Sequence, residues 1–136
     1  MGREFLQLAR ELLASGKSAR HWRGAVIHAY YAVLLECRDI MARWGLPAPP
    51  RQQVHAKVRL RLVYATDPDL KRIGYALDDL SRDRNAANYD STALSIFASP
   101  TLAQTNTDKA ADALALLDAI DADPARRTAA AASIRP

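Results

Sequence analysis

The chain has little cysteine and glycine, and it has no long apolar run. Cys37 is the only cysteine among 136 residues, which excludes an internal disulfide and a cysteine-rich zinc site. Five glycines and seven prolines are too few for an extended or collagen-like chain. Charged residues interrupt the apolar runs well before the roughly 20 residues that a membrane span needs. The N-terminal residues 1–5 have no apolar run behind them, so we expect no secretory signal, no membrane association and a cytoplasmic location.

Motifs that identify common enzyme classes are also missing. The sequence has no Gly-rich phosphate loop and no dinucleotide fingerprint. His21 and His28 lie seven residues apart, too far along one helix to share a metal ion comfortably, and three glutamates are too few for a di-iron bundle. Cys37 lies on an apolar stripe and is predicted to be a buried small hydrophobe. We therefore expect no metal site and no cofactor.

The positive charge is unevenly spread along the chain. The formal net charge is +4, and fifteen of the nineteen cations are arginine. Residues 1–89 hold 15 basic and 9 acidic side chains, whereas residues 90–136 hold 4 basic and 6 acidic ones. Arginine favours forked contacts with phosphate or carboxylate. Two interpretations stay open: the excess aids solubility, or it forms an anion-binding surface.

Apolar residues recur at helical spacing, and no segment shows strand alternation. The pattern predicts helices over about 3–15, 18–44, 52–64, 68–89 and 107–122, with a short helical turn near 93–97. We expect an all-α fold, an antiparallel bundle of four main helices plus a short one, over residues 1–122. The Ala-rich residues 123–136 lack an apolar stripe, which predicts a mobile tail or a frayed helix. The helix over 18–44 is apolar nearly all round, so it is either central to the bundle or meets a second subunit.

The helix over 68–89 carries the most unusual feature of the sequence. Its apolar stripe, Leu70, Ile73, Leu77 and Leu80, continues at the same spacing into Arg84. A half-buried arginine needs a partner, because an unpaired charge away from water is costly. Glu36, Asp39 or a helix C-terminus is one possible partner. The other interpretation is a site for phosphate or ribose that is formed by Arg84, Asn88 and Tyr89.

Two stretches together resemble a known family. They are Trp22-Arg23-Gly24-Ala25-Val26-Ile27-His28-Ala29-Tyr30-Tyr31-Ala32-Val33-Leu34 and Arg84-Asn85-Ala86-Ala87-Asn88-Tyr89-Asp90, with Val54-His55 between them. In this order and spacing they are similar to HEPN domains, in the branch whose Arg-led motif ends in Tyr-Asp. The resemblance covers roughly residues 3–120. It implies a helical bundle, a homodimer with two Arg motifs at a shared cleft, and a place in toxin–antitoxin or phage-defence systems beside a minimal nucleotidyltransferase antitoxin.

The chain departs from the active form of that motif. Many HEPN proteins are metal-independent ribonucleases in which a histidine follows the arginine by four to six residues, whereas Tyr89 stands five residues after Arg84. Tyrosine has an unperturbed pKa of about 10 and is a poor general base at neutral pH. Either catalysis is absent, or His28 or His55 substitutes from another helix. A packing or surface role for both histidines is also open.

Three hypotheses about function follow. The leading one is an RNA- or nucleotide-binding or regulatory module in which Arg84 contacts phosphate and Asn85, Asn88 and Tyr89 shape the pocket. Arg82 and the cations of the helix over 52–64 add non-specific attraction. The second is a weak metal-independent endoribonuclease toxin that uses Arg84 and Tyr89, with His28, His55 and Tyr31 as auxiliary residues. The third is a dimeric protein-interaction module that uses the second apolar face of the helix over 18–44.

Overall fold

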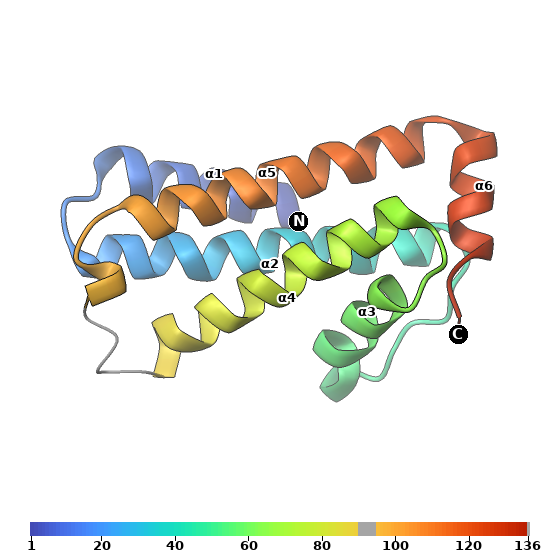
Figure 1. Ribbon diagram of the computed structural model, residues 1–136, viewed down its shortest axis with the longest axis horizontal. Helices are drawn as coiled ribbons and strands as arrows, with labels where there is room; N and C mark the ends of the chain where they lie inside the picture. The colour runs from blue at the N-terminus through green and yellow to red at the C-terminus, as the bar shows by residue number, and fades with distance from the viewer. Residues whose placement is uncertain (90–94, 136) are drawn as a thin grey trace.

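The computed structural model describes residues 1–89 and 95–135, except for the side chains of Tyr89 and Ser95. Over these residues the fold is all-helical and contains no strand, so the predicted all-α class is confirmed. The helices shown in Figure 1 are α1 (Gly2–Ser15), α2 (Ala19–Arg43), η1 (Arg51–Gln53), α3 (Val54–Val63), α4 (Pro68–Tyr89), η2 (Ser95–Phe97), α5 (Thr101–Ala122) and α6 (Pro124–Ala132). Within the described residues, no helix has both the length and the apolar character needed to cross a membrane.

Helix α2 is the centre of the fold. It packs against α1, α4 and α5, and more lightly against α3 (Figure 1). Its small and branched side chains are completely covered: Ala29, Ala32, Val33 and Cys37 are each 0% exposed. A helix that is covered on several sides must be apolar on several sides. The central position of α2 within one chain therefore accounts for most of its two apolar faces.

Helix α5 begins six residues before the position that the sequence suggested. We expected irregular structure up to Asn106 and a cap at Thr107, but the helix starts at Thr101 after Pro100. Thr107 is buried inside the helix, where its hydroxyl donates to the carbonyl of Ala103 at 2.8 Å. Asn106 is also buried, and its amide donates to the carboxylate of Asp83 at 3.1 Å. Two polar residues on the core face conceal the apolar stripe there.

The segment expected to be a C-terminal tail forms helix α6. Asp123 caps this helix, because its carboxylate accepts from the backbone N–H of Ala125 at 3.0 Å and of Arg126 at 3.4 Å. Ala130 (0% exposed) and Ile134 (6% exposed) join the same hydrophobic core as α2, α4 and α5. The buried residue of α6 itself is Ala130, and Ile134 adds one large side chain just after the helix. The stripe of large residues that sequence analysis looks for is not needed.

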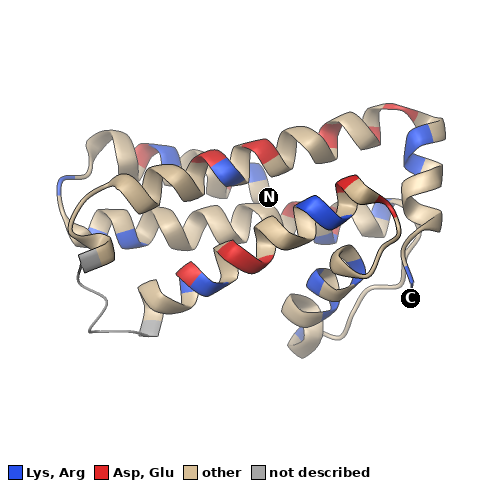
Figure 2. Cartoon of the chain, in the orientation of Figure 1, with Lys and Arg blue, Asp and Glu red and all other residues tan. Residues whose placement is uncertain are grey.

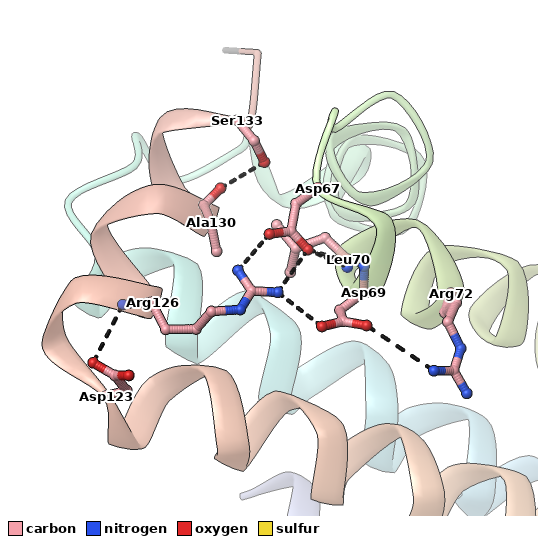
Figure 3. A network of polar contacts seen from close by, with 8 residues as sticks. All are labelled: Asp67, Asp69, Leu70, Arg72, Asp123, Arg126, Ala130 and Ser133. Atoms are coloured by element: carbon pink, nitrogen blue, oxygen red, sulfur yellow. Dashed lines mark hydrogen bonds and ion pairs between the residues drawn. The ribbon is translucent and has the colours of Figure 1, made fainter.

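An arginine network fixes α6 to the start of α4 (Figure 3). The carboxylate of Asp67 caps α4 by accepting from the backbone N–H of Asp69 at 2.9 Å and of Leu70 at 3.1 Å. Arg126 donates through both terminal nitrogens to Asp67 and also donates to Asp69 at 2.8 Å. The hydrogen bond from Arg126 is the largest of the effects that lower the pKa of Asp67. Arg126 is therefore an arginine whose charge is matched by two carboxylates.

Candidate functional site

The candidate site forms where the buried stripe of α4 ends. Leu77 (1% exposed) and Leu80 (0% exposed) lie in the core, and Arg84 follows on the same face. Arg84 is half-buried, and its Nε is covered and has no hydrogen-bond partner. Helical periodicity therefore carries a guanidinium to the edge of the core, as the sequence predicts.

Aromatic side chains of α2 surround the Arg84 guanidinium. Its central carbon lies 4.9 Å from the centroid of the Tyr30 ring and 5.6 Å from that of the Tyr31 ring. At these distances a cation is attracted to the ring faces. One Nη of Arg84 also lies 3.5 Å from Nδ1 of His55, at the start of α3. Residues from α2, α3 and α4 thus meet around one positive charge.

Tyr30 fixes the orientation of the His55 ring. Its hydroxyl lies 2.5 Å from Nδ1 of His55, and the two rings are stacked with centroids 5.7 Å apart. Arginine can only donate hydrogen bonds, so Nδ1 must be an acceptor when both Tyr30 and Arg84 approach it. The hydroxyl of Tyr30 then donates, and the proton of the neutral imidazole lies on Nε2. His55 is an exposed residue, so the site gains a second donor beside the guanidinium.

Burial and charge keep the neighbours of Arg84 neutral. The pKa of His55 is lowered, chiefly by partial burial of the ring beside Tyr30 and Tyr31 and further by the charge of Arg84. The pKa of Tyr30 is raised by burial, and its interaction with Arg84 opposes that rise only in part. Both groups are therefore uncharged at pH 7, and Arg84 supplies the positive charge of this cluster.

The carboxylates proposed as partners of Arg84 pair with other residues. Glu36 pairs with Arg3 at 3.1 Å, and Asp39 pairs with Arg38 at 2.8 Å. The helix C-terminus is also served by another arginine, because Arg23 donates to the carbonyl of Ala87 at 3.0 Å. In the part of the chain that the structure describes, Arg84 forms no ion pair with a carboxylate.

The structure brings some of the predicted site residues together and separates others. Arg84, His55 and Tyr31 are neighbours, with the Tyr31 and His55 rings edge to face at 6.0 Å. Arg82 is exposed and pairs with Asp79 at 3.2 Å. The remaining predicted residues are Asn85 and Asn88, which are exposed on α4, and Tyr89, whose side chain lies outside the described residues.

His28 belongs to a neighbouring layer. Its ring centroid lies 5.6 Å from that of Phe5, whose ring in turn lies 6.0 Å from Tyr31. Burial lowers the pKa of His28, and its Nδ1 is covered without a hydrogen-bond partner. His28 is thus separated from Arg84 by aromatic rings, whereas His55 touches it.

Tyr30 was not among the site residues predicted from the sequence. The residue is 2% exposed, yet its hydroxyl is the group that orients His55. A buried tyrosine usually finds a hydrogen-bond partner, and that expectation was the available signal. Cys37, by contrast, is buried as predicted, and burial raises its pKa to about 12. No group of three or more metal-binding side chains occurs within the described ranges 1–89 and 95–135.

Comparison of the chain with protein-family models, with curated proteins and with solved structures gives no match.

Proposed function

We propose that this chain binds RNA by holding a backbone phosphate at Arg84. The observation that carries the proposal is that Arg84 is held by aromatic rings and an imidazole, without a carboxylate among the described residues. Arginine presents several donors in a fork that fits phosphate oxygens. A guanidinium that is positioned by the fold and not neutralised by it is suited to an anionic ligand.

The neighbours of Arg84 fit this role. The Nε2–H of His55 is a second donor toward an anion, and Tyr30 holds the ring in that tautomer. Asn85 and Asn88 are exposed on the same end of α4 and supply amide donors and acceptors for ribose or base edges. Since the cluster offers donors around a positive charge, it favours recognition of phosphate over proton abstraction.

The resemblance to HEPN domains supports RNA as the source of the phosphate and a homodimer as the binding unit. The second apolar face of α2 consists of Ile27, Tyr31, Leu34 and Leu35; Leu34 is buried within one chain, whereas the other three are half-buried, so part of this face remains for a second copy. Tyr31 belongs both to this face and to the Arg84 cluster, so such a dimer would bring two Arg84 sites toward each other. A toxin–antitoxin or phage-defence setting, with a nucleotidyltransferase partner, is part of the same proposal.

Binding of a fluorescent single-stranded RNA at several salt concentrations tests the proposal. Affinity should fall as salt rises, because Arg84 displaces counterions from phosphate. Arg84→Ala should weaken binding while the thermal unfolding of the protein stays cooperative. Arg72→Ala is the matched control, because it removes the same charge from the same helix at an exposed ion pair outside the site. Equal affinities for the wild type and Arg84→Ala would refute the proposal.

A metal-independent endoribonuclease is the second candidate, favoured by the contact between His55 and Arg84. When Arg84 moves onto a phosphate, the neutral His55 ring can carry its proton on Nδ1, where the N–H donates a hydrogen bond to the hydroxyl oxygen of Tyr30 and leaves Nε2 unprotonated. Nε2 then accepts the proton of the ribose 2′-hydroxyl as its oxygen attacks the adjacent phosphorus. The bond to the 5′-oxygen breaks, and the imidazolium returns a proton to that leaving group.

This candidate predicts RNA cleavage in the presence of a chelator. His55→Gln should abolish cleavage, whereas His21→Gln should retain it, because His21 bonds to Ser18 at the start of α2. RNA that remains intact with the purified protein at high concentration argues for the binding function alone.

A further inference from the structure

A second basic pocket lies at the other end of α3. Its lining residues are Lys57, Leu60, Arg61, Tyr64 and Arg135, around a volume of about 240 Å³. Three of the five are cations and none is acidic. Figure 2 shows basic residues along α3 and no acidic residue on that helix. The pocket joins the last turns of α3 to the chain after α6, where the backbone N–H of Thr66 donates to the carbonyl of Ser133 at 3.3 Å.

The cations of this pocket are not neutralised within the described residues. Neither Lys57 nor Arg135 forms a hydrogen bond or ion pair there, in contrast to Arg59, which pairs with Asp78 at 3.1 Å. Arg61 is only 8% exposed, and its single hydrogen bond is to the carbonyl of Pro47 at 2.7 Å. Its Nε is covered and has no partner. Three cations thus line one pocket, and the carbonyl of Pro47 is the one acceptor that they bond among the described residues.

An exposed aromatic ring completes the pocket. Tyr64 is 64% exposed, and Leu60 beside it is 39% exposed. A phenol ring at the rim of a basic pocket is suited to stacking on a nucleobase, while the cations hold the attached phosphate. The volume is smaller than the roughly 300–1,000 Å³ of pockets that enclose a whole small-molecule ligand. It fits one unit of a longer chain better than a complete cofactor.

We propose that this pocket holds one nucleotide of a single-stranded RNA, with its phosphate at Lys57 and Arg135 and its base on Tyr64. The choice of RNA rests on the proposed function. Arg61 lies six positions after His55 along α3, a rise of about 9 Å. His55 and Arg59 contact residues of α4, whereas Lys57, Arg61 and Tyr64 line the pocket. A bound strand therefore passes around α3 from the Arg84 site to the pocket.

Equilibrium binding of a labelled 12-nucleotide RNA, compared with a trinucleotide, tests this inference. The double variant Lys57→Ala/Arg135→Ala should weaken binding of the 12-nucleotide RNA by about tenfold or more. It should also make the slope of log affinity against log salt shallower by about 1.4, since each lost contact to a single strand contributes about 0.7. The trinucleotide, which spans one site, should be affected less. Tyr64→Ala should lower affinity without changing the slope, and Tyr64→Phe should restore it.

The matched control is Arg10→Ala/Lys17→Ala. It removes the same net charge from exposed positions in α1 and the turn that follows it. Equal losses of RNA affinity in the control and in Lys57→Ala/Arg135→Ala would overturn the pocket, because the lower net charge alone would then explain the loss. The pocket would also be overturned if a polyglutamate peptide displaced the labelled RNA as well as unlabelled RNA does and if Tyr64→Ala left RNA affinity unchanged.

The Arg84→Ala variant separates this inference from the proposed function. If Arg84→Ala weakens binding and the pocket variants do not, the pocket is refuted and the Arg84 site stands. If only the pocket variants weaken binding, the pocket stands and the Arg84 site is refuted. RNA that binds to none of the proteins refutes both.

Discussion

An arginine lies at each end of helix α4, and the two arginines differ in the groups that surround them. At the start of the helix, Arg126 contacts the carboxylates of Asp67 and Asp69 (Figure 3). Near its end, Arg84 lies over the rings of Tyr30 and Tyr31 and touches His55. The first charge is matched inside the fold. The second is positioned by the fold without a carboxylate in the described part of the chain.

The difference separates a structural arginine from a candidate ligand-binding one. Two carboxylates around Arg126 leave little attraction for a further anion, and the same contacts fix α6 to α4. Aromatic rings attract a guanidinium but leave its net charge intact. Arg84 can therefore bind an anion without first breaking an ion pair, and its removal should affect ligand binding more than folding.

The largest expected effect is that the two arginine variants lose different properties, RNA affinity in one and thermal stability in the other. Arg84→Ala should weaken RNA binding by about 10- to 100-fold, as expected when a charged hydrogen-bonding group worth about 1.5–3 kcal/mol is lost. Arg126→Ala should leave RNA affinity within about twofold and lower the midpoint of thermal unfolding. Fluorescence anisotropy and calorimetry on both variants make the comparison. If Arg126→Ala weakened RNA binding as much as Arg84→Ala, the distinction between a structural and a ligand-binding arginine would be contradicted.

The next effect concerns stability at the start of α4. Asp67→Ala removes the helix cap and the main acceptor of Arg126. Loss of a cap alone costs typically about 1 kcal/mol, within a range of about 0.5–2. We expect the free energy of unfolding in urea to fall by about 1–2 kcal/mol, with RNA affinity unchanged. Asp67→Asn is the matched variant, because it keeps a capping oxygen and loses the charge. Its free energy of unfolding should lie between those of the wild type and Asp67→Ala.

The smallest effect is a pH dependence that differs between the two ends. The folded state lowers the pKa of His55, by burial and by Arg84. The unfolded chain therefore takes up the proton first, so stability is complete above about pH 6.5 and falls as the pH drops below that value. Arg126 lowers the pKa of Asp67, so its contribution is lost only below about pH 4.

Urea unfolding at pH 7, 5.5 and 3.5 tests this order. His55→Gln should reduce the loss of stability between pH 7 and 5.5. His28, whose pKa is also lowered by burial, accounts for the remainder in that window. Asp67→Asn should leave this first step unchanged and reduce the second one. A first step that His55→Gln does not alter would contradict the assignment.

Helical periodicity predicted most of the fold. The stripe through Leu70, Ile73, Leu77 and Leu80 is buried as expected, and the central position of α2 accounts for most of its two apolar faces. The errors have a common cause. Asn106 and Thr107 are polar residues on a buried face, and α6 docks through alanine, so large apolar residues do not mark either segment. Hydrophobic periodicity identifies buried faces that are made of large apolar side chains. It cannot identify polar side chains that are buried because they form hydrogen bonds.

The candidate site was predictable only in part. The position of Arg84 on a core stripe follows from spacing along one helix. Its neighbours Tyr30 and His55 come from two other helices, and their approach depends on how α2, α3 and α4 cross. One sequence contains no direct signal for such crossings. The pairing of Arg126 with Asp67, 59 residues away, was missed for the same reason.

Proton NMR of the three histidine imidazoles tests phosphate binding at Arg84, because His55→Gln and His21→Gln each assign one set of resonances and leave the third set to His28. When single-stranded RNA is added to the wild-type protein, the account predicts that the His55 resonances shift and that its pKa rises, because a phosphate beside the ring stabilises the imidazolium. In Arg84→Ala the shift should be largely lost, and His21 should not respond in either protein. RNA that binds without moving the His55 resonances would contradict the account.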